Sequence, residues 1–99
     1  MRVEWLHPAI HDLQRLRDFL LPRSQASARR AIQVIKGAVA LLNANPGLGK
    51  PVEDLPDYHD LIIPFGAAGY VLRYRIRGDV IYIVAVRHGK EAGFSGGGE

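Results

Sequence analysis

The sequence predicts a single α+β domain in which a helical hairpin covers one face of an antiparallel sheet. Three observations support this fold class: apolar residues recur at helical spacing between residues 8 and 42, two apolar-rich runs flank Gly78-Asp79, and Gly- and Pro-rich breakers separate these segments. At 99 residues, of which 47% are hydrophobic, the chain can bury one core. We expect residues 1–94 to form this domain and residues 95–99 to form a flexible tail, because Ser-Gly-Gly-Gly-Glu is low in complexity.

The first half of the chain predicts a short strand and two helices. Residues 2–6 alternate as a strand does, and Pro8 suits the first turn of a helix, where its missing N–H does no harm. Pro22 ends that helix, and Ser24 is a good N-cap for the next one. Small residues in the second helix would let the two pack closely as an antiparallel hairpin. The two apolar stripes are Ala9, Leu13, Leu16 and Leu20, and Ala28, Ala31, Ile32, Ile35, Val39 and Leu42.

The second half predicts a three-stranded antiparallel meander. Residues 43–49 contain several breakers, and residues 50–58, which are acidic and hold two prolines, predict a loop. A short strand follows at residues 61–63. The turn at residues 66–69 then leads into a hairpin whose strands flank Gly78-Asp79. The expected order is therefore strand, helix, helix, strand, strand, strand.

The hairpin separates core residues from arginines. A two-residue turn at Gly78-Asp79 would place Arg77 opposite Val80, Tyr74 opposite Ile83 and Leu72 opposite Ala85. Three arginines cannot be buried unpaired, because an isolated charge in an apolar interior costs several kcal/mol. We therefore expect the arginine face to be open to solvent or to a partner. The core face carries Leu72, Tyr74, Ile76, Ile81, Ile83 and Ala85, and the arginine face carries Val71, Arg73, Arg75, Arg77, Val80, Tyr82, Val84 and Val86.

The strongest chemical constellation in the chain combines cations with groups that can move a proton. Its members are Arg73, Arg75, Tyr82, Arg87, His88 and Lys90. Arginine and lysine could hold phosphates while His88 or Tyr82 moves a proton, as metal-free RNA cleavage requires. Arg75 and Tyr82 are also cross-strand neighbours suited to cation–π stacking, and Arg87 is expected on the core side opposite Tyr70. The residues alone leave three interpretations open: a partner-binding surface, a nucleic-acid contact, and a solvated face without a role.

Composition excludes several other kinds of chemistry. The absence of cysteine rules out disulfides and thiolate metal sites. His7 and His11 have the i, i+4 spacing of a zinc-binding helix, but no Glu follows His7, so we expect no metal site and no cofactor. The net charge of +3 is small, and no segment approaches the apolar length of a membrane span. We expect a cytoplasmic protein without a membrane partner.

Three segments together resemble the ParE branch of the ParE/RelE toxin superfamily. They are VEWLHPAIHDLQRLRDFL near the N-terminus, the linker NPGLGKPVEDLP, and the hairpin YVLRYRI…VIYIVAVRHGKE. The resemblance extends over residues 2–94, nearly the whole chain. It implies a toxin of a bacterial type II toxin–antitoxin pair with the RelE-like two-layer fold.

The resemblance also implies a test for enzymatic activity. RelE-like members cut messenger RNA in the ribosome with lysines before and on their second strand, an arginine just after the tyrosine of the third, and a basic residue after the last. The corresponding positions here are Asp60, Ile62, Val71 and Glu91. These replacements would leave developing phosphate charge without donors, so we expect no RNase activity and no catalytic residues. The alternatives are a ribosome-dependent mRNA endonuclease with a rearranged site, and an inactive toxin retained as an antitoxin-binding decoy.

ParE-like members are inhibitors of DNA gyrase that act by binding. The resemblance of this chain to them therefore implies gyrase as its target. We expect the open sheet face and the turn after the last strand to contact it, and we expect no sequence-specific nucleic-acid binding. The expected target-binding residues are Arg73, Arg75, Arg77, Tyr82, Arg87, His88 and Lys90.

The second implied partner is a ParD-like antitoxin, whose acidic, amphipathic C-terminal segment folds along the toxin. Coupled folding of such a segment suits a groove with an apolar floor and a basic rim. We expect the helical hairpin to provide this groove. The expected antitoxin-binding residues are Leu13, Leu16, Arg17, Leu20, Arg29, Arg30 and Ile32.

Overall fold

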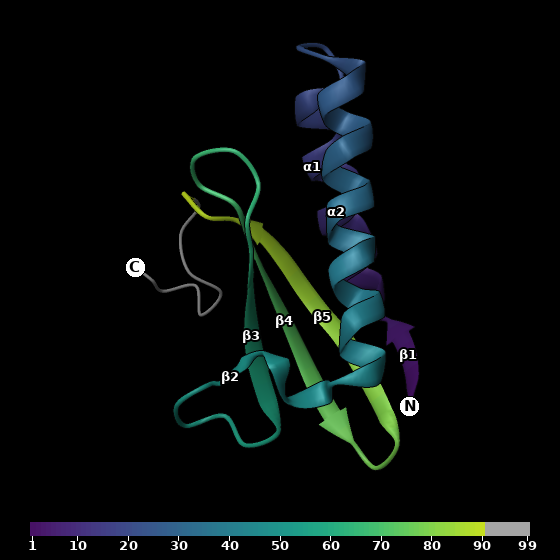
Figure 1. Ribbon diagram of the computed structural model, residues 1–99, viewed down its shortest axis with the longest axis vertical. Helices are drawn as coiled ribbons and strands as arrows, with labels where there is room; N and C mark the ends of the chain where they lie inside the picture. The colour runs from purple at the N-terminus through teal and green to yellow at the C-terminus, as the bar shows by residue number, and fades with distance from the viewer. Residues whose placement is uncertain (91–99) are drawn as a thin grey trace.

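The computed structural model describes residues 1–90 and has two layers, a helical hairpin on one face of a five-stranded sheet (Figure 1). The elements are β1 (Arg2–Trp5), α1 (His7–Leu20), α2 (Gln25–Ala44), the 3₁₀ helix η1 (Pro46–Leu48), β2 (Lys50–Pro51), β3 (Tyr58–Ile63), β4 (Tyr70–Arg77) and β5 (Val80–His88). This order confirms the predicted α+β class. The tail predicted at residues 95–99 lies outside the described residues.

The strand order in the sheet is β1-β5-β4-β3-β2. Strands β3, β4 and β5 form the predicted antiparallel meander. β1 lies parallel to β5, and its pairing ends with Trp5 opposite Ile83. The second half of β5 therefore has no strand partner on the β1 side among the described residues, which becomes important for the position of α1.

The acidic segment at residues 50–58 is more ordered than the sequence predicts. β2 adds a short edge strand beside β3, and β3 begins at Tyr58 rather than at residue 61. The Val52 N–H closes the connecting turn by donating to the Tyr58 carbonyl at 2.9 Å. Asp54 and Asp57 adopt left-handed φ angles of 66° and 73°, which aspartate tolerates better than most residues. The loop prediction was wrong here because these acids form the turn of a β2–β3 hairpin.

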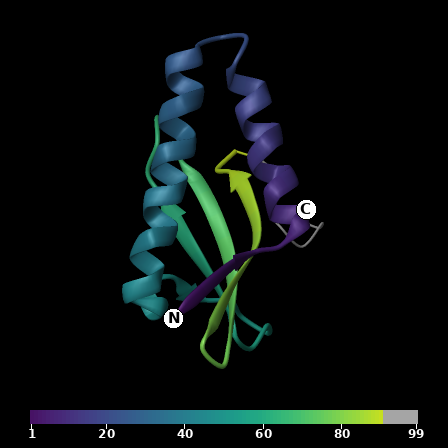
Figure 2. The same cartoon turned by 90° about the vertical axis from the view of Figure 1, so that its right-hand side faces the viewer.

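The helices pack their predicted apolar stripes against the sheet, and Figure 2 shows them in front of it. The predicted N-cap is confirmed, because the Ser24 hydroxyl accepts a hydrogen bond from the Ser27 N–H at 3.1 Å. Ile32 was expected on the stripe but is only half-buried. The connection between the helices lies beyond the end of the sheet (Figures 1 and 2). Buried helical residues are Ala9 and Leu16 in α1, and Ala28, Ala31, Ile35, Val39 and Leu42 in α2.

The β4–β5 hairpin has the predicted register near its turn. Arg77 pairs with Val80, and Tyr74 pairs with Ile83. Gly78 has a φ of 58°, the left-handed value that the first residue of such a turn requires. The pattern of apolar residues and the turn chemistry therefore agree over this half of the hairpin.

Beyond Tyr74 the predicted register is wrong by one residue. Val84 is an extra residue of β5, a β-bulge, so that Leu72 lies opposite Val86 rather than Ala85. A bulge inserts one residue into one strand and reverses the faces of all residues that follow it. Val86, predicted on the arginine face, is accordingly buried in the core.

The same bulge corrects the end of β5. His88 lies opposite Tyr70, on the side of the helices, whereas Arg87 lies opposite Val71. The predicted register placed Arg87 opposite Tyr70 because it did not include the extra residue Val84. At the basic end of β5, each side chain therefore lies on the face of the sheet opposite to the predicted one.

Tyr74 ties the connection between α2 and β2 to the sheet. Its side chain is fully buried, and its hydroxyl donates to the Pro46 carbonyl at 2.7 Å and accepts from the Gly49 N–H at 2.8 Å. Burial raises the pKa of Tyr74, and the hydrogen bond from Gly49 opposes that rise. A Cβ at position 49 would lie 2.9 Å from the Tyr74 ring and the Asp60 carbonyl, so this close approach requires glycine.

We predict that Tyr74→Phe lowers the free energy of unfolding by about 1–3 kcal/mol, because the buried Gly49 N–H and the partly buried Pro46 carbonyl lose their partner. Tyr82→Phe is the matched control, since Tyr82 is only half-buried and should change stability by less than about 0.5 kcal/mol. Urea denaturation followed by circular dichroism measures both. Equal stability of the two variants would contradict this account of Tyr74.

Candidate functional site

The sheet face turned away from the helices holds the predicted arginines. Alternation along β4 sends Leu72 and Tyr74 into the core and the arginines to the opposite side. Among residues 1–90 the helical layer covers only the other face (Figure 1). We call this surface the open sheet face; it comprises Tyr58, Asp60, Ile62, Val71, Arg73, Arg75, Arg77 and Tyr82.

Arg73 is paired within the open sheet face. The register places Asp60 opposite it, and the Asp60 carboxylate accepts hydrogen bonds from Arg73 Nε at 2.8 Å and from Nη2 at 3.0 Å. This hydrogen bonding raises the pKa of Arg73, while burial opposes the rise. The two side chains are only 15% and 27% exposed. The pair therefore removes much of the positive charge that the sequence assigned to this position.

The remaining positive charge lies nearer the β4–β5 turn. Arg75 packs over the Tyr58 ring, with 5.3 Å between its guanidinium carbon and the ring centroid, and Tyr82 is its cross-strand neighbour. Arg75 Nε is buried and has no hydrogen-bond partner among the described residues. Arg77, at the end of β4, is exposed. Arg75, Arg77 and Tyr82 thus share this face as predicted, and Tyr58, which the sequence placed in a loop, adds a second aromatic ring.

Arg87 has a structural partner at the edge of the sheet. Its guanidinium contacts Asp12 of α1, and the same carboxylate accepts a hydrogen bond from the Val86 N–H at 3.0 Å. Asp12 therefore binds β5 where β1 no longer does, and it joins α1 to the sheet. The sequence analysis did not identify Asp12; the available signal was an acid three residues after Ala9, on the core side of the helix.

We predict that Asp12→Ala lowers the free energy of unfolding by about 1–3 kcal/mol, because a strand N–H and Arg87 both lose a charged acceptor. Asp18→Ala is the control on the same helix, since Asp18 forms an exposed ion pair with its neighbour Arg17, and the substitution should change stability by less than about 0.5 kcal/mol. Thermal unfolding measures both. If Asp12→Ala were as stable as Asp18→Ala, the carboxylate would not join α1 to β5.

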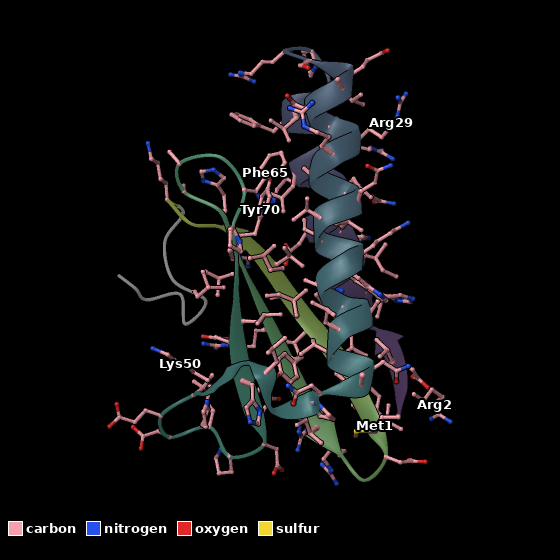
Figure 3. All side chains as sticks on the ribbon, viewed as in Figure 1. Met1, Arg2, Arg29, Lys50, Phe65 and Tyr70 are labelled. Carbon is pink, nitrogen blue, oxygen red and sulfur yellow. The ribbon has the colours of Figure 1, made fainter. Side chains whose placement is uncertain are left out.

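His88 and Lys90 lie beside the helices and not on the open sheet face. The His88 ring meets Tyr70 edge-on, with 5.8 Å between centroids, and Phe65 packs against Tyr70 at 5.5 Å. Figure 3 shows Phe65 and Tyr70 close together between the β3–β4 loop and the helices. They border a cleft of about 480 Å³, which we call the inner cleft; its lining comprises Arg15, Leu16, Phe19, Leu20, Phe65, Gly66, Ala67, Tyr70, His88 and Lys90.

A second concavity lies between the two helices. This outer groove has a volume of about 450 Å³ and an apolar floor with a basic rim, and within residues 1–90 no acidic side chain lines it. Arg29 and Lys50 project on opposite sides of the molecule in Figure 3, which separates the groove from the sheet edge. The lining residues are Arg17, Leu21, Gln25, Ala28, Arg29, Ile32, Gln33 and Lys36.

The predicted antitoxin-binding residues divide between these two concavities. Three of them, Arg17, Arg29 and Ile32, line the outer groove. Leu20 lines the inner cleft, and Leu16 does so with only 5% of its surface exposed, so it offers little contact area. Leu13 packs against the core, and Arg30 is exposed and donates a hydrogen bond to the Ser27 hydroxyl at 3.3 Å.

Three of the four positions that the family resemblance matches to basic residues of RelE-like members lie on the open sheet face. Asp60 is paired with an arginine, and Ile62 pairs with Val71 in the next strand. Ile62 is 64% exposed, so this part of the surface is apolar. The fourth position, Glu91, lies outside the described residues.

None of the four histidines of the chain lies on the open sheet face. His7 and His11 are on α1, and His59 faces the core side, where its ring stacks on Tyr74 at 5.2 Å. The fourth, His88, borders the inner cleft. The arrangement predicted for RNA cleavage, in which His88 acts beside Arg75 and Tyr82, is therefore not assembled.

Two further features bear on ligands and membranes. Within residues 1–90, no three His, Cys, Asp or Glu side chains are grouped so that they could hold a metal ion. Neither helix in that range combines the length and the apolar character that crossing a membrane requires.

A sequence profile described as the ParE toxin of the type II toxin-antitoxin system parDE matches residues 3–93. The chain belongs to this ParE toxin family. Two proteins of Caulobacter vibrioides are similar over 83 residues each: Toxin RelE3 is 37% identical, over 84% of this chain and 88% of the relative, and Toxin RelE1 is 32% identical, over 84% and 87%. The family resemblance recognised in the sequence is thus confirmed.

Solved structures agree with this membership. The ParE-family toxin resembles a chain from a structure of the chromosomal ParDE TA system from P. aeruginosa, with a TM-score of 0.73 and 26% identity over 89% of this chain and 95% of that one. A chain of the intact E. coli RelBE toxin-antitoxin complex matches with a TM-score of 0.63 over 91% and 98%, and its 14% identity bears on the fold alone. The protein is therefore a type II toxin of the ParE/RelE superfamily with a RelE-like fold.

Proposed function

We propose that this ParE-family toxin inhibits DNA gyrase by binding, without catalysing a reaction, and that a ParD-like antitoxin neutralises it. The observation that supports this most is the state of the open sheet face. An acid neutralises Arg73, two aliphatic residues occupy neighbouring positions, and no histidine side chain lies on this face. Cleavage of RNA requires donors for the developing phosphate charge together with a general acid and base, and this face does not offer that set.

A binding mechanism needs only a complementary surface. Arg75 and Arg77 supply positive charge, while Tyr58 and Tyr82 supply aromatic contact area. Arginine and tyrosine are the residue types that contribute most at protein interfaces, because each combines a large apolar surface with a polar end. We therefore assign the contact with gyrase to the part of the open sheet face nearest the β4–β5 turn.

The competing candidate is ribosome-dependent mRNA cleavage, which the RelE names of the two Caulobacter relatives favour. It would have to use Arg73, Arg75, Tyr82 and His88. The bulge at Val84 places His88 on the helical side of the sheet, away from the other three. The geometry thus supports the gyrase proposal over this alternative.

The helical hairpin supports the antitoxin part of the proposal. The outer groove presents Arg17, Arg29 and Lys36 around an apolar floor that includes Ile32. An acidic amphipathic segment would bury its apolar side chains there and pair its carboxylates with the rim. We therefore propose the outer groove as one docking surface for the antitoxin.

The purified protein is expected to inhibit supercoiling of relaxed plasmid by gyrase, and the double variant Arg75→Glu/Arg77→Glu should require at least a tenfold higher concentration. The reversal replaces the half-buried Arg75 and the exposed Arg77, the two arginines nearest the β4–β5 turn, with acids that repel an acidic partner. Arg30→Glu is the control, because it makes the same kind of charge change on the exposed side of α2 and should inhibit as the unmodified protein does.

Two results would count against the proposal. One is the absence of gyrase inhibition at concentrations that stop growth. The other is messenger RNA cleavage by the purified protein in a ribosome-containing translation mixture, which would establish the competing candidate instead.

A further inference from the structure

Strand β1 leaves one edge of the sheet open. It is the first strand in the order β1-β5-β4-β3-β2, and within residues 1–90 its only strand partner is β5. In Figure 2, β1 is the strand nearest the viewer, and neither helix passes in front of it. An uncovered edge presents N–H and C=O groups that can pair with another strand.

The hydrogen bonds of β1 show which backbone groups face this edge. The Arg2 N–H donates to the Asp79 carbonyl at 3.0 Å, and the Leu6 N–H donates to a carbonyl of β5, also at 3.0 Å. Successive residues of a strand direct their N–H and C=O groups to alternate sides, so the even-numbered residues of β1 bond to β5. The N–H and C=O groups of Val3 and Trp5 therefore point outward.

The side chains of β1 divide between the two faces of the sheet. Val3 and Trp5 pack against the core. Arg2 and Glu4 lie on the opposite side, where Glu4 is next to Tyr82 of the open sheet face. Arg2 and Glu4 form an ion pair at 3.1 Å, and their side chains remain 65% and 46% exposed. The edge thus carries one accessible cation and one accessible anion, on either side of Val3.

This arrangement of charges is complementary to itself. If two β1 strands pair antiparallel about a two-fold axis at Val3, Arg2 of each copy lies opposite Glu4 of the other. The outward N–H and C=O groups of Val3 then bond to those of Val3 in the second copy. Opposite charges directly across an antiparallel pair are stabilising, and like charges are destabilising. A register centred on Arg2 or on Glu4 would place like charges opposite each other, so the register centred on Val3 is favoured.

We propose that β1 binds the β1 strand of a second copy of this chain, which joins the two five-stranded sheets into one continuous sheet. The contact is isologous, since each copy uses the same strand. It involves a strand of four residues from each copy, so the interface belongs to the small, transient class. We therefore expect a dimer that dissociates on dilution.

Pairing at this edge would place both open sheet faces on the same side of the dimer, because residues directly opposite in an antiparallel pair share a face. The two β4 strands, which carry Arg75 and Arg77, would be five strand spacings apart, or about 24 Å. The dimer would thus present the proposed gyrase contact twice, and a target with two matching sites would bind it more tightly than the monomer. This consequence rests on the proposed function, whereas the self-association does not.

Sedimentation equilibrium of the purified free toxin, from about 10 μM to about 1 mM, tests the pairing. The unmodified protein should dimerise with rising concentration. Glu4→Arg should weaken the dimer at least tenfold, because each Arg2 then faces an arginine. The double variant Arg2→Glu/Glu4→Arg exchanges the two signs and should restore the dissociation constant to within twofold. Glu53→Arg is the control, since it makes the same charge change at an exposed position of the β2–β3 hairpin and should have less than a twofold effect.

Hydrogen exchange of single amides, measured by NMR, provides a second readout. The Val3 N–H should exchange more slowly as the toxin concentration rises, whereas the Glu4 N–H, which faces β5, should exchange slowly at every concentration.

Three results would overturn the inference. The first is a monomer throughout the concentration range, and the second is a dimer that Glu4→Arg leaves unchanged, which would use another surface. The third is a Val3 N–H that becomes protected only in the complex with the antitoxin, which would identify an antitoxin strand as the occupant of the edge. Gyrase is absent from these experiments, so a failure of the proposed function would leave their results unaffected.

Discussion

The alternation of side chains along β4 is the constraint on which the rest of the structure depends. Leu72 and Tyr74 face the helices and are fully buried, while the arginines between them must face the other way. One strand thus builds the floor of the core and the charged surface at once. Asp60 pairs with Arg73 and neutralises its charge. The net positive charge of the face is therefore smaller than the number of its arginines suggests.

A single extra residue in β5 divides the basic residues of the chain into two regions. Because Val84 forms a bulge, the faces of the residues after it are reversed, and His88 lies on the side of the helices instead of on the face that holds Arg75. The open sheet face keeps cations and aromatic rings without a histidine, and the inner cleft gains the histidine without a phosphate-holding arginine pair. This separation is the basis of our proposal that the protein acts by binding a macromolecule and not by catalysis.

Much of the fold follows from local chemistry. The helical stripes, the cap at Ser24 and the turn at Gly78 each specify their own element, and the structure agrees with them except at Ile32, which is only half-buried. The bulge at Val84 could not be predicted in this way, because valine favours a regular strand and nothing local marks it as the extra residue. It is set by tertiary packing, which requires Val86 in the core.

The candidate site was predictable only in part, for the same reason. Positions on β4 follow from alternation, so the arginine row was placed correctly. Asp60 on β3, which pairs with Arg73 of that row, and Asp12 on α1, which pairs with Arg87 of β5, come from elements whose positions depend on long-range packing. The inner cleft likewise exists only because α1 extends over the β3–β4 loop, a contact that no local pattern encodes.

The role proposed for this toxin requires that its first effect in the cell be DNA damage and not the arrest of translation. Brief expression in growing bacteria, with a DNA-damage reporter and pulse-labelled protein synthesis recorded in the same culture, decides between the two. A reporter that rises while transcripts remain intact and translation still proceeds is the expected result. Fragmented messenger RNA and an immediate halt of translation, with the reporter silent, would contradict it.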